Sequence, residues 1–241
     1  MSKGQFDPPP QTPAAFQAAT GCSDAQLADM LTYLVLLTAW NEKMNLVGPS
    51  ALAEFWPRHA YDSAQLLKLA PEANTWADLG AGAGFPGLVL AILLKGQPGA
   101  QVHLVESMAK RCRFLAEVAQ KLALPTQIHN RRAEDLGIRV DIVTARACAP
   151  LVRLLGYAEP YLRKGATGLF LKGQDVVSEL TEAAKYWKIQ SELIGSCTDG
   201  RAQIIVVKGL APQRSDGSGK TRSRTRSKAR DKAGNKGHRR P

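Results

Sequence analysis

The sequence predicts an α/β fold, with a mainly parallel sheet of about seven strands covered by helices and an N-terminal helical layer. From Thr75 onwards, short apolar runs alternate with amphipathic helical segments, which is the pattern of consecutive βα units. The apolar strand Thr75–Leu79 also runs into glycines at every second position, and the apolar helix Leu88–Leu94 follows. A strand, a glycine turn and a helix in this order hold nucleotide-like ligands in parallel sheets.

The N-terminal layer is expected to begin at Ser23–Gln26, which has the form of a capping box. Apolar residues then recur at helical spacing from Leu27 to Leu37, and a second helical region covers about Leu52–Leu69. Residues 1–21 are rich in Pro, Gln and Ala, and we expect them to form a disordered lead.

The remaining elements follow the alternating pattern within one domain, residues 22–211. Expected strands are Thr75–Leu79, Val102–Glu106, Thr126–His129, Val140–Thr144 and Thr167–Leu171, with a closing antiparallel pair at Trp187–Leu193 and Gln203–Lys208. Expected helices start near Gly87, Lys110, Ala149 and Val176.

Positive charge is concentrated at the C-terminus. The chain has a net charge of +11, and the segment from Pro212 to Pro241, with 11 Lys and Arg against 2 Asp, carries +9 of it. This segment has no large apolar residue apart from prolines, so it cannot bury a core. We expect residues 212–241 to form a disordered basic tail, either a nonspecific RNA-binding arm or a solubility tail.

Cysteine and histidine are too scattered to indicate a metal site. Cys22, Cys112, Cys148 and Cys197 form no C-x-x-C pair and no metal-ligand spacing with the four histidines. We expect free thiols, a cytoplasmic protein and no metal. The strongest apolar run, Leu88–Leu94, is too short to span a membrane, and the N-terminus has no signal-peptide pattern.

The glycine turn has the composition of a cofactor-binding loop, because a residue without Cβ lets the backbone approach a ligand closely. The stretch Gly82–Gly87 also matches the G-x-G-x-x-G pattern of dinucleotide enzymes. Glu106 ends the next expected strand, 26 residues after Gly80, where a carboxylate can accept hydrogen bonds from ribose hydroxyls. The alternative is a strand-end carboxylate in solvent. A dinucleotide enzyme and an adenosylmethionine-dependent methyltransferase both remain open at this point.

Seven short motifs together resemble one family, the bacterial small-subunit ribosomal RNA guanine-N7 methyltransferases, historically called glucose-inhibited division protein B. Over about Trp40 to Leu210 they are WNEKMNL at 40–46, RHAYDS at 58–63, DLGAGAGFPG at 78–87, ESMAKR at 106–111, RAE at 132–134, TARA at 144–147 and LKG at 171–173. The glycine loop is common to many methyltransferases, whereas the first two motifs are far more specific. The family usually has Ser at the position of Ala81, and the resemblance includes neither the lead nor the tail.

The resemblance implies a Rossmann-like adenosylmethionine-dependent methyltransferase sheet, with S-adenosylmethionine as cofactor. It implies a guanine of 16S ribosomal RNA, naked or in the small ribosomal subunit, as substrate. It places the methyl donor against Gly80, Phe85, Ala133, Glu134 and Arg146. Glu106 occupies the position that holds the ribose in similar folds, and the loop glycines Gly82 and Gly84 complete the expected cofactor site.

Methyl transfer from a sulfonium to guanine N7 is an in-line displacement by a lone pair that carries no proton. No general base is needed, so catalysis can rest on orienting sulfur, methyl and N7, which contributes up to roughly 7–11 kcal/mol. The sequence fits this chemistry, since it has no Ser/His/Asp triad, metal cluster or evident carboxylate pair. We assign no catalytic residue, but Arg146 and Lys172, at two expected strand ends, are candidates for positioning the reactants.

Six basic residues are candidates for RNA binding: Arg58 and His59, which precede the expected sheet, and Lys110, Arg111, Arg132 and Lys172. Lys110 and Arg111 open an expected helix, where cations oppose the helix dipole, so either a phosphate contact or a solvated first turn would explain them. His59 is alternatively a core histidine with satisfied hydrogen bonds. Because N7 must stay open to the methyl group, we expect the enzyme to recognise the O6, N1 or N2 side of the guanine, or the RNA shape.

Two other functions remain open. A NAD-dependent oxidoreductase would need the glycine spacing in register from Gly82 and a second acid–base site. A non-catalytic RNA-binding protein would keep the basic tail but would not need the glycine loop. Of the three, we favour a monomeric methyltransferase that acts on 16S ribosomal RNA without membrane association.

Overall fold

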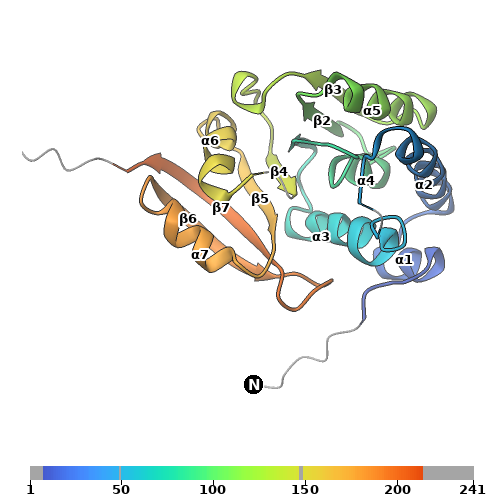
Figure 1. Cartoon of the computed structure of the whole chain (residues 1–241), viewed down its shortest axis with the longest axis horizontal. Coiled ribbons are helices and arrows are strands. Elements are labelled where there is room, and N and C mark those ends of the chain that lie inside the picture. Colours follow the sequence, from blue (N-terminus) through green and yellow to red (C-terminus); the bar gives the residue numbers. More distant parts are fainter. Residues whose placement is uncertain (1–7, 49, 147–148, 214–241) are drawn as a thin grey trace, which may run out of the picture.

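The computed structural model describes residues 8–48, 50–146 and 149–213. At its centre, a seven-stranded sheet has the order β3-β2-β1-β4-β5-β7-β6 (Figure 1). The strands are β1 (Thr75–Leu79), β2 (Gln101–Glu106), β3 (Thr126–Asn130), β4 (Ile142–Arg146), β5 (Thr167–Lys172), β6 (Trp187–Gly195) and β7 (Gln203–Pro212). Strands β1 to β5 pair in parallel, while β7 runs antiparallel to β5 and β6. The predicted α/β fold, with about seven strands and a closing antiparallel pair, is confirmed.

The strand order places the site. The chain moves outwards from β1 to β2 and β3, then crosses back to continue with β4 and β5 on the other side of β1. Such a reversal opens a crevice at the carboxyl ends of the central strands, where open α/β sheets bind their ligands. The glycine turn after Leu79 and the end of β4 at Arg146 both lie at this reversal.

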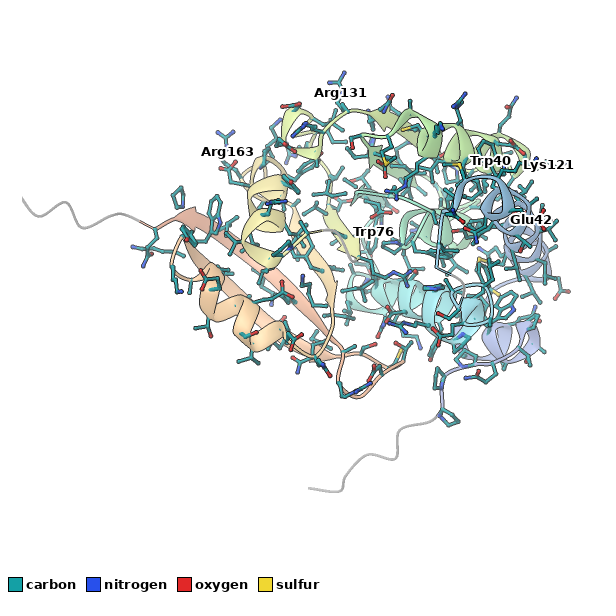
Figure 2. The ribbon with its side chains drawn as sticks, in the orientation of Figure 1. Trp40, Glu42, Trp76, Lys121, Arg131 and Arg163 are labelled. Atoms are coloured by element: carbon teal, nitrogen blue, oxygen red, sulfur yellow. The ribbon has the colours of Figure 1, made fainter. Side chains whose placement is uncertain are left out.

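Helices cover both faces of the sheet (Figure 1). On one face lie α4 (Gly87–Leu93), α5 (Ala109–Lys121) and the N-terminal helices, and on the other lie α6 (Leu151–Leu162) and α7 (Val176–Ala183). Successive strand residues alternate between these two cores, so Trp76 belongs to the first and Ala77 to the second. Figure 2 shows Trp76 inside the molecule, while Arg131 and Arg163 point outwards.

The N-terminal layer consists of α1 (Pro13–Thr20), α2 (Asp24–Met44), a π-helical turn η1 (Phe55–Ala60) and α3 (Tyr61–Leu69). The expected capping box is formed, since Ser23 Oγ accepts from the Gln26 N–H and the Gln26 side chain accepts from the Ser23 N–H. Tyr33 of α2 is fully buried and its hydroxyl donates to the Ala83 carbonyl over 2.5 Å. The helical layer is thereby joined directly to the glycine turn.

The second half of the expected disordered lead departs from the prediction. Thr12 caps α1 by accepting from the Ala15 N–H over 3.2 Å, and Phe16 is fully buried against Trp56. The Thr-Pro pair at the start of this helix is a favourable N-terminus, and one buried aromatic ring anchors it. Residues 1–7 and 214–241, which include the start of the lead and most of the basic tail, lie outside the described residues.

Several element boundaries also differ from the sequence prediction, and the closing strands β6 and β7 extend to Gly195 and Pro212 rather than to Leu193 and Lys208. Strand β4 is Ile142–Arg146 rather than Val140–Thr144, because its pairing with β1 starts at Ile142 opposite Trp76. Helix α6 begins at Leu151, directly after Pro150, rather than near Ala149. The shift of β4 makes Arg146 the last residue of that strand. Within the described part of the chain, no helix is both long enough and apolar enough to cross a membrane.

Candidate functional site

The glycine turn is a tight loop whose glycines have different surroundings. Gly80, Gly82 and Gly84 have φ angles of 72°, 54° and 95°, a region that favours glycine. A Cβ on Gly84 would lie 2.3 Å from Leu88 Cδ1, so this glycine is required for packing. Among the described residues, the atom nearest to a Cβ on Gly82 would be the Gly80 carbonyl oxygen at 3.6 Å. Space for a ligand is therefore available beside Gly82.

Two buried carboxylates hold the loop. Glu106, only 4% exposed, accepts from the Gly82 N–H over 3.1 Å and from the Met108 N–H over 2.8 Å. Asp78 accepts from the Gly87 N–H over 2.9 Å, and complete burial raises its pKa to about 7. The alternative of a solvated carboxylate at Glu106 is thus wrong, because its backbone contacts fix it against the loop.

His59 and Arg146 both contact the ring of Phe85, at the end of the loop. The His59 ring stacks on the Phe85 ring with centroids 4.8 Å apart, and Arg146 Cζ lies 5.0 Å from the Phe85 centroid. Neither ring nitrogen of His59 has a hydrogen-bond partner among the described residues. Burial, with Arg146 and Arg58 nearby, lowers the pKa of His59 to about 3. His59 is therefore neutral at pH 7, and it does not have the satisfied hydrogen bonds of the alternative prediction.

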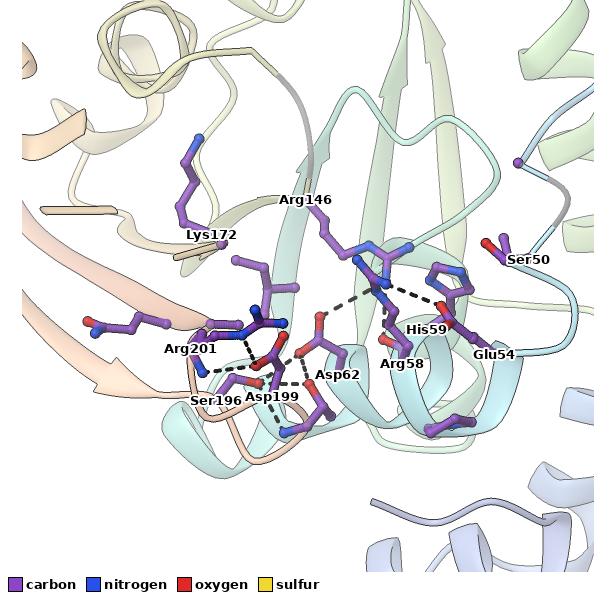
Figure 3. A pocket seen from close by; sticks show the side chains of 18 of the residues that line it. Ser50, Glu54, Arg58, His59, Asp62, Arg146, Lys172, Ser196, Asp199 and Arg201 are labelled. Atoms are coloured by element: carbon purple, nitrogen blue, oxygen red, sulfur yellow. Dashed lines mark hydrogen bonds and ion pairs between the residues drawn. The ribbon is translucent and has the colours of Figure 1, made fainter. Parts of the chain in front are cut away.

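A pocket of about 810 Å³ opens beside this cluster, at the carboxyl ends of β4 and β5 (Figure 3). We call it the β4–β5 pocket. The glycine loop does not line it, but Arg146 does, so Arg146 connects the two. The cations along its wall each face a carboxylate, in the pairs Arg58–Glu54 (3.2 Å), Arg146–Asp62 (4.0 Å), Lys172–Glu179 (2.7 Å) and Arg201–Asp199 (3.5 Å).

Asp62 is the most highly connected carboxylate of this pocket. Its Oδ1 accepts from Gln65 Nε2 (2.6 Å), Thr198 Oγ1 (2.9 Å) and Ser196 Oγ (3.0 Å), while Oδ2 faces Arg146 Nη1. Burial raises the pKa of Asp62, and the Thr198 bond, the Arg146 charge and the Ser196 bond oppose that shift. Asp62 thereby joins α3 to the connection between β6 and β7.

The Arg146 side chain is mostly buried and contacts protein groups more than solvent. Its Nη1 donates to the Arg58 carbonyl over 3.3 Å, and its side chain is 17% exposed. Lys172, the other positioning candidate, is similarly enclosed, because its Nζ forms an ion pair with Glu179 and donates to the Ala149 carbonyl over 3.3 Å. Both candidates thus lie on the wall of the β4–β5 pocket, as expected for residues at strand ends.

A second group of cations borders the loop from the side of β2 and β3. Lys110 and Arg113 extend from the start of α5, and Arg131 follows β3 directly. All three are exposed, and among the described residues no carboxylate oxygen lies within 4.0 Å of their charged atoms. We call these three residues the outer rim.

Other predicted site residues lie beside Glu106 or directly after β3. Arg111 approaches Glu106 at 3.7 Å, and Arg132 approaches Glu134 at 3.7 Å. Ala133 and Glu134 lie in the 3-10 turn η2 (Ala133–Asp135), and Ala133 shares a core with Leu79 at the end of β1. Among the described residues, no group of three or more His, Cys, Asp or Glu side chains could hold a metal ion.

The sequence analysis did not assign roles to several pocket residues. Asp62 stands one helical turn after Arg58 and His59 within the RHAYDS motif, so its helical spacing could have indicated it. The residues from the β6–β7 connection carried no such signal: Ser196, Thr198, Asp199 and Arg201. They reach the site only because β7 inserts between β5 and β6.

Comparisons with known proteins agree with this geometry. A model of the family described as rRNA small subunit methyltransferase G matches residues 26–205. A protein named Ribosomal RNA small subunit methyltransferase G from Caulobacter sp. (strain K31) is 67% identical over 200 residues, which cover 83% of this chain and 90% of the relative. A protein of the same name from Bradyrhizobium sp. (strain ORS 278) is 52% identical over 179 residues, covering 73% and 81%.

A solved structure supports the fold assignment alone. Cofactor-bound Rv0187 from MTB superposes with a TM-score of 0.54 at 15% identity, covering 85% of this chain and 99% of that chain. The family match spans most of the described residues and contains the glycine loop, the Phe85 cluster and the Asp62 connections. The resemblance inferred from the seven motifs is thereby confirmed, and the chain belongs to the rRNA small subunit methyltransferase G family.

Proposed function

We propose that this protein transfers a methyl group from S-adenosylmethionine to N7 of one guanine in 16S ribosomal RNA. The observation that carries the proposal is the position of Arg146, which lies against Phe85 of the glycine loop and also lines the β4–β5 pocket. A cofactor at the loop and a base in the pocket would then meet at one residue. A volume of about 810 Å³ lies within the range of pockets that enclose small ligands.

The residues present fit this cofactor. The open space beside Gly82 would admit it, Glu106 would accept from its ribose hydroxyls, and Phe85 and Arg146 would border its reactive end. We propose Gly80, Gly84, Ala133 and Glu134 as the remainder of this site. When bound, S-adenosylmethionine supplies an electrophilic methyl group, and the protein contributes orientation rather than proton transfer.

RNA binding is proposed for the surface around these two sites. The outer rim offers exposed cations that have no carboxylate partner within the described part of the chain, which suits phosphate contacts. Arg58, Arg111, Arg132 and Lys172 are paired with carboxylates, so they would bind RNA only by sharing or exchanging those partners. His59 would act through its neutral ring. We infer a cytoplasmic monomer that acts on 16S RNA or on the small ribosomal subunit.

The test is methylation in vitro followed by nucleotide-resolved mass spectrometry. The protein is incubated with S-adenosylmethionine and with 16S RNA, or with small subunits from a strain that lacks the enzyme. We expect N7-methylguanine at a single position. Methylation of another atom, or of many guanines, would contradict the proposal. Calorimetric titration with S-adenosylmethionine and with NAD tests the oxidoreductase alternative, and binding of neither would indicate a non-catalytic RNA-binding protein.

A further inference from the structure

Resting on the proposed methylation at N7, we propose that Asp62 selects guanine by accepting hydrogen bonds from its N1–H and N2–H₂ groups, with Arg146 facing O6. Asp62 is then a specificity-determining residue of the β4–β5 pocket. The proposal rests on three features: a carboxylate with one occupied and one free oxygen, its distance from Arg146, and the order in which the side chains leave the glycine loop.

The Asp62 carboxylate is held in a fixed orientation. Its Oδ1 accepts three hydrogen bonds, from Gln65, Ser196 and Thr198, and these fix the plane of the group. Its Oδ2 has no hydrogen bond among the described residues and lies 4.0 Å from Arg146 Nη1. The side chain is 13% exposed and lines the pocket. Asp62 therefore presents one preorganised acceptor, so little conformational entropy of this side chain is lost when a base binds.

The separation of Asp62 from Arg146 suits the edge of a guanine. At 4.0 Å the two groups attract each other but are too far apart for a hydrogen bond. A base edge with an acceptor beside donors could satisfy both groups at once, and guanine has this edge, with O6 beside N1–H and N2–H₂. Adenine places an amino group at position 6 and a lone pair at N1, so it would face Arg146 with a donor and Asp62 with an acceptor.

The order of the side chains agrees with the order of atoms around the purine. Starting from the reacting atom, the perimeter of guanine reads N7, O6, N1 and N2. The side chains follow the same order from the loop outwards. Phe85 comes first, Arg146 Cζ lies 5.0 Å from the centroid of the Phe85 ring, and Asp62 Oδ2 lies 4.0 Å from Arg146 Nη1. A guanine with N7 towards the loop thus places O6 at Arg146 and N1 and N2 at Asp62. This orientation leaves N7 open to the methyl group.

The same contact would strengthen during the reaction. The N7 lone pair forms the new N–C bond while the C–S electron pair returns to sulfur, so positive charge moves onto the purine. A carboxylate hydrogen-bonded to N1–H and N2–H₂ attracts that charge more strongly in the transition state than in the bound substrate. Interactions that grow in this way raise the rate constant rather than only the affinity.

The test compares Asp62→Asn with Asp141→Asn on RNA that carries guanosine or inosine at the methylated position. Inosine keeps N7, O6 and N1–H but lacks the N2 amino group. In Asp62→Asn, the Gln65 amide can only donate, so the new amide oxygen should turn towards it and the amide NH₂ should face the pocket. Asp141 is a matched control, because its Oδ2 also accepts three hydrogen bonds, from Asn74 and Thr75, at the opposite end of the sheet.

Single-turnover rates are measured at saturating S-adenosylmethionine and RNA. We expect the unmodified enzyme and Asp141→Asn to methylate guanosine about tenfold or more faster than inosine, the scale of one hydrogen bond to a charged group. In Asp62→Asn the guanosine rate should fall by a similar factor and the two rates should become nearly equal. A preference for guanosine that Asp62→Asn retains, or its absence in the unmodified enzyme, would overturn the assignment of Asp62. Absence of any N7 methylation by the unmodified enzyme would instead contradict the proposed function.

Discussion

The β4–β5 pocket and the outer rim both contain cations and both lie at the carboxyl ends of the strands, but their cations have different partners. In the pocket, Arg146 faces Asp62 and Arg201 faces Asp199. In the outer rim, Lys110, Arg113 and Arg131 have no carboxylate within 4.0 Å among the described residues. A phosphate in the pocket would meet carboxylates as well as cations, whereas a phosphate at the rim would meet cations alone.

This difference indicates that, in the proposed function, the outer rim binds the RNA backbone and the β4–β5 pocket recognises the base. Unpaired surface cations bind the RNA backbone without regard to sequence, and they give affinity that depends on salt. Paired donors and acceptors at fixed positions can instead read the edge of a base. The glycine loop lies between the two regions, so a cofactor bound there would have the base-reading side on one flank and the backbone-binding side on the other.

The largest effect is expected for Gly82→Val, which tests whether the loop holds the cofactor. A branched side chain beside Gly82 would fill the open space, so binding of S-adenosylmethionine should be lost. Since φ is 54°, the free energy of unfolding should also fall by about 1–3 kcal/mol. Calorimetry and urea unfolding measure the two effects.

Gly165→Val is the matched control for backbone strain. Gly165 has a φ of 98° and belongs to the turn between α6 and β5, and no atom of the described residues lies within 4 Å of its Cβ position. It should lose similar stability but keep its cofactor affinity. A folded Gly82→Val protein with normal affinity would show that the cofactor binds elsewhere.

Glu106→Ala should weaken binding of S-adenosylmethionine by roughly 1.5–3 kcal/mol, the scale of a hydrogen bond to a charged group. Part of this loss would come from the loop itself, since the Gly82 N–H loses its acceptor. Glu106→Gln keeps one oxygen for that N–H, so it should separate the effect on the loop from the effect on the cofactor. Turnover of the bound cofactor should change much less. Normal affinity with lost turnover would instead give Glu106 a part in the chemistry.

The sequence was sufficient for features that depend on neighbours in the chain. The strand before Gly80, the capping box at Ser23 and the alternation of strands with helices all arise from local periodicity and turn chemistry. Glu106 could be selected because it ends the strand after the loop. These features follow from spacing alone, so no knowledge of the tertiary contacts was needed.

Features that depend on distant contacts were not predictable in this way. Asp62 gains its fixed orientation from Ser196 and Thr198, which lie more than 130 positions later in the sequence. Helix α1 is stabilised by burial of Phe16 against Trp56, although the sequence around it has a composition typical of disordered segments. Local composition does not show which distant side chain will cover a residue.

The basic tail should act like the outer rim, as a further supply of cations for the RNA backbone. Removing residues 214–241 deletes the net charge of +9 but keeps the last backbone contact of the fold, from the Gln213 N–H to the Tyr186 carbonyl. Each phosphate contact that is lost should lower the slope of log affinity against log salt by roughly 0.7–0.9. RNA binding at several salt concentrations measures this.

The shortened protein should still methylate the same nucleotide at the same rate when RNA is saturating, because the tail lies outside the residues that the family model matches. An unaltered salt slope would assign the tail to solubility. A different methylated nucleotide would show that the tail takes part in recognition.

The smallest effect is expected for single arginine substitutions. They also test most directly the difference between the β4–β5 pocket and the outer rim. Arg131→Ala removes an exposed outer-rim cation and should lower the salt slope of RNA binding by roughly 0.7, as for one phosphate contact with a single strand. Arg201→Ala removes an exposed pocket cation that Asp199 already faces at 3.5 Å, so the slope should stay nearly constant. The guanosine-to-inosine rate ratio should stay constant in Arg131→Ala, since the outer rim does not line the pocket. Equal changes of slope in both variants would contradict the division between the two regions, because paired and unpaired cations would then bind the backbone equally.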